Sequence, residues 1–307
     1  MPSAGSVGGI RHCGGAWAVG ARPAVRNRPA ERRYDHRVTT YADVRPTQRT
    51  PFARYRHSLW LLTKRDLHVR YTTNVLGYVW SILDPLLMAG IYYLVFVVVF
   101  HRGDNPSESP YIVFLLAGLL PWTWFNGAVS DFTRAFSREA KLIRSTAIPR
   151  TIWINRIVLS KGIEFALSLP VLVLFVIFSG AQLHWQIVFY PLGVLIQAVM
   201  LVGLGLIVAP LVVFFKDLER AVKLLLRLLF YASAVLYPAS EVPKDSIFRY
   251  FIDINPLVGL FGVYRAGFFP SDLHWGLVII SAVGALILVA VGWLVYSRTI
   301  RSVLKEM

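Results

Sequence analysis

Cysteine is almost absent from this chain of 307 residues, since Cys13 is the only one. A single thiol excludes an intrachain disulfide framework and any metal site built from several cysteines. The sequence also lacks a GxxxxGK[ST] phosphate loop, so any nucleotide fuel must be used by another protein. It has no DxD or DDxxD cluster of acids, and its one DxN pattern is Asp253 and Asn255. The acidic clusters of a metal-dependent transferase are therefore missing.

Charged side chains are scarce as well. They make up 16% of the chain, and apolar residues make up 56%; a soluble globular protein has about 25% charged residues. The mean hydropathy is +0.55. Several segments must therefore face lipid instead of water, and we expect an all-α polytopic membrane protein.

Six apolar stretches are candidates for membrane-spanning helices, which need roughly 20 mostly apolar residues each. Five have that length and occupy residues 76–100, 111–130, 157–178, 187–215 and 277–296. The remaining stretch, 224–237, is short and ends before Pro238, so we expect it to span with help from its neighbours and to be the fifth of six spans. Residues 247–250 and 257–269, separated by Pro256, are predicted as short external re-entrant helices between spans five and six.

The basic residues are unevenly divided between alternate loops. With Lys161 and Arg227 assigned to the loops that they adjoin, 28 of the 32 Lys and Arg residues lie in the terminal segments and even-numbered loops. Basic residues mark the cytoplasmic side, so both termini are predicted to be cytoplasmic. The net charge of +15 is thus explained by topology. Because it is spread over separate loops, it indicates no nucleic-acid partner.

These patterns predict that the chain has three regions. Residues 1–50, rich in Arg, Pro, Gly and Ala and without the apolar core of a signal peptide, are predicted to be a disordered basic cytoplasmic tail. This tail either lies against anionic headgroups or has no specific role. Residues 51–73 are predicted to form an amphipathic interfacial helix, and residues 74–307 the transmembrane domain.

Residues 60–85, which we call the joint, connect this helix to the first span without a linker. At 100° per residue, Lys64, Arg65 and His68 share a polar stripe, with Trp60 and Tyr71 on the apolar side. Asp66 and Arg70 interrupt the apolar arc, and their i, i+4 spacing predicts an ion pair between them. Gly77 would let the chain turn into the membrane. A mechanical gate and a passive anchor both fit this pattern.

Four motifs in this order carry a resemblance to a known family. The first motif combines Arg65-Asp66, Arg70-Tyr71, Leu76-Gly77, Trp80 and Asp84-Pro85-Leu86. The other three are KLIRSTAIPR at 141–150, KDLER at 216–220 and VLYPASEVP at 235–243. From about residue 52 to its carboxyl end, the chain resembles the ABC-2 type permeases that export bacterial O-antigen, capsule and teichoic acid polysaccharides. The long basic tail and Asn74, where a Ser is expected, depart from the family pattern.

The resemblance implies a non-enzymatic permease subunit of an ATP-driven transporter in the bacterial plasma membrane. It suggests a homodimer that works with two copies of an ABC ATPase subunit, and ATP and Mg would bind to that partner. The substrate would be a polyprenyl-linked polysaccharide. The Arg- and Ala-rich tail favours an actinobacterial exporter of lipid-linked galactan. Within this picture the gate helix would use Trp60, Arg65, Asp66, Arg70, Tyr71 and Gly77.

The loop at residues 137–150 is the best candidate for the contact with the ATPase. Its pattern predicts a short amphipathic coupling helix ended by Pro149, with Arg138, Lys141, Leu142, Arg144 and Arg150 as contacts. The alternative is a basic loop folded against lipid headgroups. Asp217 and Glu219 of the KDLER motif are predicted to form a second contact.

Aromatic side chains are the candidate lining of a sugar conduit, because rings stack on sugars without fixed bond geometry. Tyr92, Phe96 and Phe100 repeat at i, i+4 and i+8, and Tyr231 and Tyr237 lie in the short fifth span. Tyr and Trp also gather at membrane interfaces whatever the substrate. To that interfacial belt we assign Trp122, Trp124, Trp185 and Trp275.

Ionisable residues inside or beside the spans are the remaining candidates. Glu164 follows Lys161 by one turn, which predicts a structural ion pair, and Asp84 precedes Pro85 at a helix break or at the conduit entry. On the external side, Glu241, Lys244 and Arg249 are predicted either to form a gate or merely to solvate a loop.

Three other functions stay open at this point. An ABC-2 exporter of drugs or small lipids would differ only in cargo. A polytopic glycosyl- or phosphotransferase acting on polyprenyl phosphate would need the acidic clusters that the chain lacks. A secondary transporter should show inverted repeats and charged midplane sites, and neither is visible.

Overall fold

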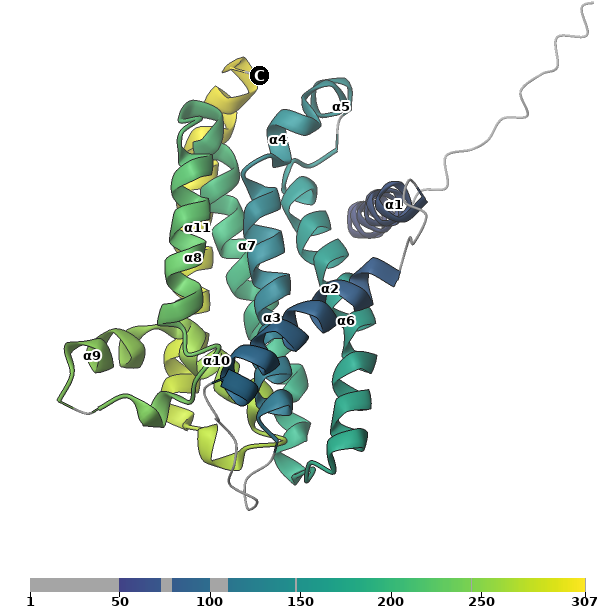
Figure 1. Ribbon diagram of the computed structural model, residues 1–307. Helices are drawn as coiled ribbons and strands as arrows, with labels where there is room; N and C mark the ends of the chain where they lie inside the picture. Colours follow the sequence, from purple (N-terminus) through teal and green to yellow (C-terminus); the bar gives the residue numbers. More distant parts are fainter. Residues whose placement is uncertain (1–49, 73–78, 100–109, 147, 244, 307) are drawn as a thin grey trace, which may run out of the picture. The chain divides into compact units, whose positions relative to one another are not determined.

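The computed structural model describes residues 50–72, 79–99, 110–146, 148–243 and 245–306, and within these ranges every regular element is a helix (Figure 1). This confirms the predicted all-α class. The basic tail, Gly77, Phe100 and Lys244 lie outside the described residues. The elements are α1 (Pro51–Thr72), α2 (Val79–Tyr93), η1 (Leu94–Val99), α3 (Tyr111–Phe132), α4 (Ala135–Arg138), α5 (Ala140–Ser145), α6 (Thr151–Ser179), η2 (Trp185–Phe189), α7 (Tyr190–Phe214), α8 (Leu218–Ala232), η3 (Ala239–Glu241), α9 (Ile247–Ile254), α10 (Pro256–Arg265), η4 (Pro270–Asp272) and α11 (Trp275–Glu306).

Four helical segments within the described ranges are long and apolar enough to cross a membrane: Tyr111–Phe132, Thr151–Ser179, Trp185–Phe214 and Trp275–Val303. They correspond to four of the predicted spans. The first predicted span is represented by α2 and η1, whose apolar part runs over Leu83–Val99. The short helix predicted at residues 224–237 is found earlier in the chain, because α8 covers the 15 residues Leu218–Ala232. A tight turn with positive φ at Ala234 then precedes Pro238.

Helices α6 and α7 pack against α3, most of whose side chains are buried, and α11 packs against α7. Helices α7 and α11 come unusually close at two glycines. A Cβ on Gly203 would lie 2.6 Å from the backbone of Val289, and a Cβ on Gly292 would lie 2.5 Å from the carbonyl oxygen of Gly203. Small residues allow this backbone approach where lipid supplies no hydrophobic driving force between helices.

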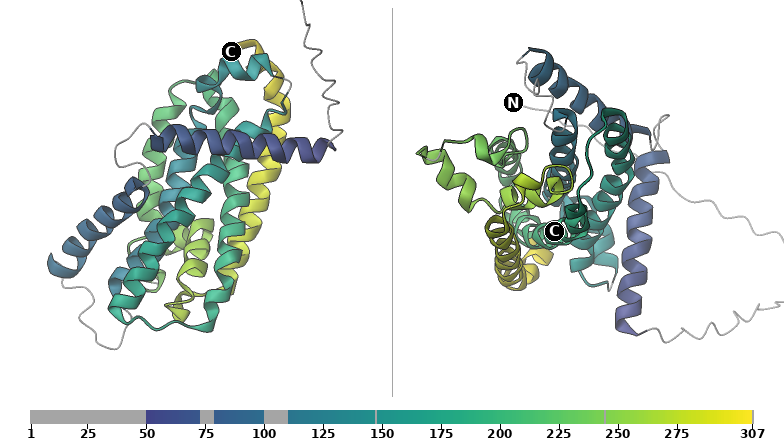
Figure 2. Two further views of the ribbon diagram at one scale, coloured as in Figure 1. Left: turned by 90° about the vertical axis from the view of Figure 1, so that its right-hand side faces the viewer. Right: turned by 90° about the horizontal axis from the view of Figure 1, so that it is seen from below.

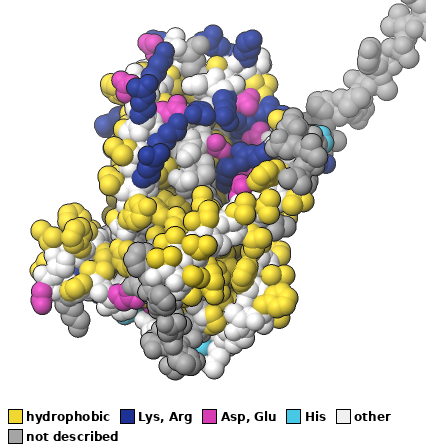
Figure 3. All heavy atoms as spheres, in the orientation of Figure 1, with side chains coloured by type: hydrophobic (Ala, Val, Ile, Leu, Met, Phe, Trp, Pro, Cys, Tyr) yellow, Lys and Arg dark blue, Asp and Glu magenta, His cyan; other side chains and the backbone are white. Residues whose placement is uncertain are grey.

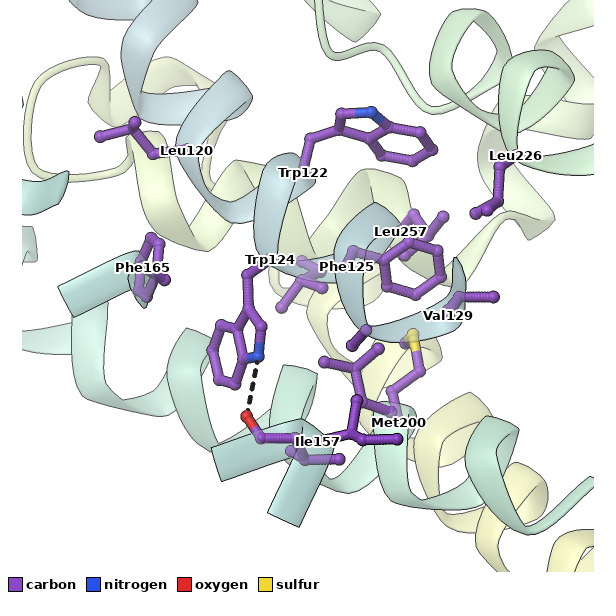
Figure 4. Packing of buried hydrophobic residues seen from close by; sticks show 14 of the residues in the cluster. Leu120, Trp122, Trp124, Phe125, Val129, Ile157, Phe165, Met200, Leu226 and Leu257 are labelled. Carbon is purple, nitrogen blue, oxygen red and sulfur yellow. Dashed lines mark hydrogen bonds between the residues drawn. The ribbon is translucent and has the colours of Figure 1, made fainter. Parts of the chain in front are cut away.

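Two tryptophans assigned to the interfacial belt belong to the core instead (Figure 4). Trp122 is 6% exposed and Trp124 is 4% exposed. Trp124 Nε1 donates a hydrogen bond of 3.2 Å to the carbonyl of Val158, so its one polar atom is satisfied without water. Trp185 and Trp275 are exposed, as the belt requires.

Helix α10 covers most of the second predicted re-entrant helix and is enclosed by protein, whereas its depth in the membrane stays a prediction. All of its residues from Leu257 to Arg265 are buried, and it packs against α3, α7 and α11. Pro256 is its first residue, and the Asn255 side chain caps the helix by accepting a 3.0 Å bond from Leu257 N. Arg265 is satisfied internally, because its guanidinium donates to the carbonyls of Phe114, Ala234 and Val235.

The two ends of the bundle differ in chemistry. Helices α4 and α5, the beginning of α6 and the carboxyl end of α11 lie at the upper end in Figure 1, whereas η2, η4 and α9 lie towards the lower end. Lys and Arg side chains gather over the upper part of the face drawn in Figure 3, and hydrophobic side chains cover the part below it. Helix α1 lies between these two ends in Figure 1.

Candidate functional site: the joint between α1 and the bundle

Helix α1 lies across the bundle, transverse to the long helices, and packs on α6 (Figure 2). Its inner face includes buried Thr63 and Tyr71, and Asn155 of α6 donates a 2.7 Å hydrogen bond to the Tyr55 hydroxyl. Lys64 and His68 of the predicted polar stripe are exposed, and so is Trp60. The face turned to the bundle is therefore mixed rather than purely apolar.

A first ion cluster ties the middle of α1 to the bundle. Arg156 of α6, whose side chain is 6% exposed, lies 3.1 Å from Asp66 and 3.3 Å from Glu139. Arg65 lies 2.6 Å from the same Glu139 and 3.3 Å from Asp66. Two arginines and two acids thus neutralise one another, which is the condition for placing charges where water is scarce.

A second ion cluster lies one turn further along α1. Arg70 contacts Glu164 of α6 at 2.6 Å and Asp131 of α3 at 3.1 Å. Lys161 lies 3.0 Å from Glu164 and 3.8 Å from Asp131. Burial by itself would lower the pKa of Arg70, but the carboxylates of Glu164 and Asp131 outweigh it and raise that pKa.

These clusters confirm the predicted Lys161–Glu164 pair. Where the sequence predicted a pair between Asp66 and Arg70, the structure gives Asp66 paired with Arg65 of α1 and Arg156 of α6, and Arg70 paired with Asp131 of α3 and Glu164 of α6. The contacts between helices could not be read from sequence spacing. Asp131, Glu139 and Arg156 were missed as site residues. The available signal was their position, since each is a charged residue at the edge of an apolar span or among basic neighbours.

A groove opens beside the second cluster, between the end of α1 and helices α2, α3 and α6. Its volume is about 910 Å³, within the range of roughly 300–1,000 Å³ typical of ligand sites. Arg70, Lys161 and Glu164 line its polar side, whereas Leu87, Met88 and Ile91 of α2 line its apolar side. Asp84 and Trp80 also line it. The groove is therefore amphipathic.

The predicted coupling helix is interrupted. Residues 135–145 form two short helices, α4 and α5, with Glu139 between them in a non-helical conformation, and the helix ends at Ser145 rather than at Pro149. The carboxylate of Glu139, the residue at this break, belongs to the first ion cluster. The predicted contacts Arg138, Lys141 and Arg144 are exposed, Leu142 and Arg150 are partly buried, and Ile143 is buried.

Glu219 of the predicted second contact is engaged within the chain. Arg134 lies 2.5 Å and Lys223 2.7 Å from its carboxylate, so it ties the loop after α3 to the start of α8. Hydrogen bonds from Arg134 and Lys223 lower the pKa of Glu219 to about 2. Asp217 is exposed.

The conduit candidates on two different segments approach one another. Tyr92 of α2 lies 6.0 Å from Phe230 of α8, measured between ring centroids, and Phe230 lies 5.2 Å from Tyr231. Tyr237 donates a 2.7 Å hydrogen bond to the carbonyl of Tyr231. The side chain of Phe96 is outside the described part of the chain.

Of the external gate candidates, Arg249 has a structural contact that the sequence did not predict. It pairs with Asp253 at 3.1 Å within α9, and its Nη1 donates a 2.9 Å bond to the carbonyl of Ala239. Glu241 is exposed at the end of η3.

Long apolar helices, an ion-paired helix lying across them and an amphipathic groove beside it are compatible with a membrane transport subunit. The chain belongs to the ABC-2 type transporter family, whose sequence profile matches residues 57–269. It is accordingly a transport subunit of the inner membrane that works with a separate ATPase subunit.

Relatives within this family carry more specific names. The chain is 34% identical to the O-antigen export system permease protein RfbA of Klebsiella pneumoniae over 78% of its own length and 91% of the relative. It is 33% identical to a protein of the same name from Myxococcus xanthus, over 80% and 93% of the two chains. It is 24% identical to the polysialic acid transport protein KpsM of Escherichia coli, over 69% and 81%.

Proposed function

We propose that this chain is the permease subunit of an ATP-driven exporter that moves a lipid-linked polysaccharide across the bacterial plasma membrane. The observation that carries the proposal is the amphipathic groove at the joint. Its polar side, with Arg70, Lys161 and Glu164, suits a hydrophilic glycan and its linkage group, and its apolar side on α2 suits a lipid chain. The names of the relatives supply the substrate class.

The proposed topology has six spans and both termini in the cytoplasm. The two spans beyond the four long ones would be α2 with η1 and residues 224–237, which begin within α8 after its first turn. The basic character of the end that carries α4, α5 and the carboxyl end of α11 supports a cytoplasmic position for that end. Helix α1 would then lie at the cytoplasmic surface, and α9 on the external side.

The proposed assembly is a homodimer with two ATPase subunits, which bind ATP and Mg. Large apolar side chains are exposed on α2 and α8, the two helices that also bring Tyr92, Phe230 and Tyr231 together. A second copy placed against these helices would enclose a ring-lined conduit. The exposed α8 residues are Leu224, Leu225, Leu228 and Tyr231.

Galactan is the proposed glycan, and its support is the Arg- and Ala-rich composition of residues 1–50. The test is direct: lipid-linked galactan and an unrelated lipid-linked glycan are compared as stimulators of ATP hydrolysis. Equal stimulation by both would contradict the galactan assignment and leave the wider proposal in place.

The proposal is tested by purifying the chain together with the ATPase encoded beside it and measuring ATP hydrolysis in lipid nanodiscs. We expect a stable complex whose hydrolysis is stimulated by lipid-linked polysaccharide. A Glu306→Gln variant, which changes an exposed acid at the end of α11, serves as the neutral control. Failure to form a complex would overturn the proposal. Stimulation by drugs or small lipids but not by glycan would favour the alternative ABC-2 cargo.

A further inference from the structure

The loop between α3 and α6 has two chemically different sides. Arg138, Lys141 and Arg144 are exposed, whereas the one acid between them, Glu139, is turned inward. Its carboxylate accepts hydrogen bonds from Arg65 of α1 at 2.6 Å and from Arg156 of α6 at 3.3 Å. The loop that presents basic side chains outward is therefore attached to α1 through Glu139.

Helix α1 connects this attachment to the groove over a short distance. Arg65, which contacts Glu139, precedes Arg70, which lines the groove, by five residues. At 1.5 Å rise per residue that separation is about 7.5 Å of continuous helix. Because a helix of this length moves as a rigid body, a displacement of Glu139 that moves Arg65 also moves Arg70 and Tyr71.

The surroundings make the link stiff. Arg156 is nearly fully buried and bonds both Asp66 and Glu139, so the loop cannot shift alone without leaving a buried guanidinium short of a partner. Arg156 belongs to α6, so all four charges stay paired only when the loop, α1 and the beginning of α6 move together. The arrangement thus favours joint movement of these three segments.

We propose that Glu139 is the positioning residue that transmits movement of the ATPase-facing loop to the groove, through Arg65 and α1. The inference rests on the proposed function for the identity of the loop's partner, but it concerns a residue and a direction of transmission that the fold class does not specify. Glu139 contacts no substrate in this role. Its carboxylate holds the loop to α1, so that a movement of the loop changes the position of the groove residues on α1.

The test follows α1 directly in the complex with the ATPase. In a Cys13→Ser background, spin labels are placed at Leu61→Cys on the exposed side of α1 and at Ser302→Cys on the exposed end of α11. Their distance is measured by electron paramagnetic resonance with and without ATP trapped by vanadate. We expect trapping to change this distance by about 2 Å or more, as for other helix shifts.

Three variants on this labelled background decide the proposal. Glu139→Gln should abolish the change, Glu139→Asp should restore part of it because the charge returns, and Glu306→Gln should leave it intact. A displacement that persists in Glu139→Gln would overturn the proposal. Absence of any displacement in the unsubstituted labelled complex would overturn it as well.

Stimulation of ATP hydrolysis by glycan is measured on the same samples, and this separates the two proposals. If trapping moves α1 in a Glu139-dependent way but no glycan stimulates hydrolysis, the proposed substrate class fails and the role of Glu139 stands. If glycan stimulates hydrolysis while α1 moves equally in Glu139→Gln, the proposed function stands and the role of Glu139 fails.

Discussion

Helices α1 and α9 both lie outside the long spans, towards opposite ends of the bundle, yet they are held in different ways. Helix α1 is tied by ion pairs to α3, α6 and the turn between α4 and α5. In α9 the ion pair that the structure describes, Arg249 with Asp253, runs within the helix. Of its apolar side chains Ile252 is buried, whereas Phe248 and Phe251 are exposed. Charge therefore fixes the position of α1, whereas α9 presents its apolar face outward.

The largest effect should come from removing the buried cation that anchors α1. Arg156→Met is expected to lower the free energy of unfolding by about 3 kcal/mol, because Asp66 and Glu139 lose a nearly fully buried partner. Thermal unfolding in detergent measures the change. The matched change on α9, Arg249→Met, removes a more exposed pair and should cost about 1 kcal/mol or less. Equal losses in the two variants would contradict the distinction between the helices.

Asp66→Ala is expected to have a smaller effect on stability and a large one on transport. Arg156 keeps Glu139 as a partner, so the loss of Asp66 should cost about 1–2 kcal/mol. The chain should still insert, because α1 is not among the candidate spans. We expect ATP hydrolysis to continue while export falls, measured by flux of lipid-linked glycan into vesicles. Normal export would reduce α1 to an anchor.

A weaker, pH-dependent effect is expected at Glu219. Because the folded chain lowers the pKa of Glu219 from its ordinary 4.5 to about 2, its ion pairs stabilise the fold fully above pH 4.5. That contribution is lost as the pH falls towards 2. The melting temperatures of the unsubstituted chain and Glu219→Gln should therefore differ at pH 7 and approach one another near pH 3. A difference that grows on acidification would contradict this sign.

The smallest effect on stability is expected on α9. Phe251→Ala should change the free energy of unfolding by about 0.5 kcal/mol or less, since the side chain is 67% exposed. A fall in glycan export at unchanged melting temperature would assign this face to the translocation route. Unchanged export would leave it as a lipid- or solvent-facing surface.

Much of the fold was predictable because lipid imposes one simple rule on sequence. Spanning helices must be long and apolar, and this rule located α3, α6, α7 and α11, although α6 begins six residues before its predicted span and α11 ends ten residues after its own. The same rule misassigned Trp122 and Trp124, because an indole is equally suited to an interface and to a buried site with one carbonyl partner. The burial of α10 within the protein was not predictable, because its short apolar sequence fits an exposed and an enclosed helix alike.

The candidate site was predictable in its location but not in its connections. Arg65, Asp66 and Arg70 stood out because charges interrupt an apolar arc. Their partners outside α1 lie 61 to 94 residues away in the chain, beyond any local pattern. The break in the helix at Glu139 was also not predictable from local sequence. Local propensity allows a continuous helix there, and the break places the carboxylate beside Arg65 and Arg156.

Sequence alone determined that this chain is an all-helical membrane protein with a charged joint before its first span, because hydropathy and charge act on each segment separately. Only the tertiary structure decided which acids and arginines pair, that α10 is part of the core, and that a groove opens beside Arg70. These outcomes depend on which helices approach one another. The physical reason is that the stability of a partly buried charge depends on its neighbours in space, and several distant acids could have satisfied each arginine.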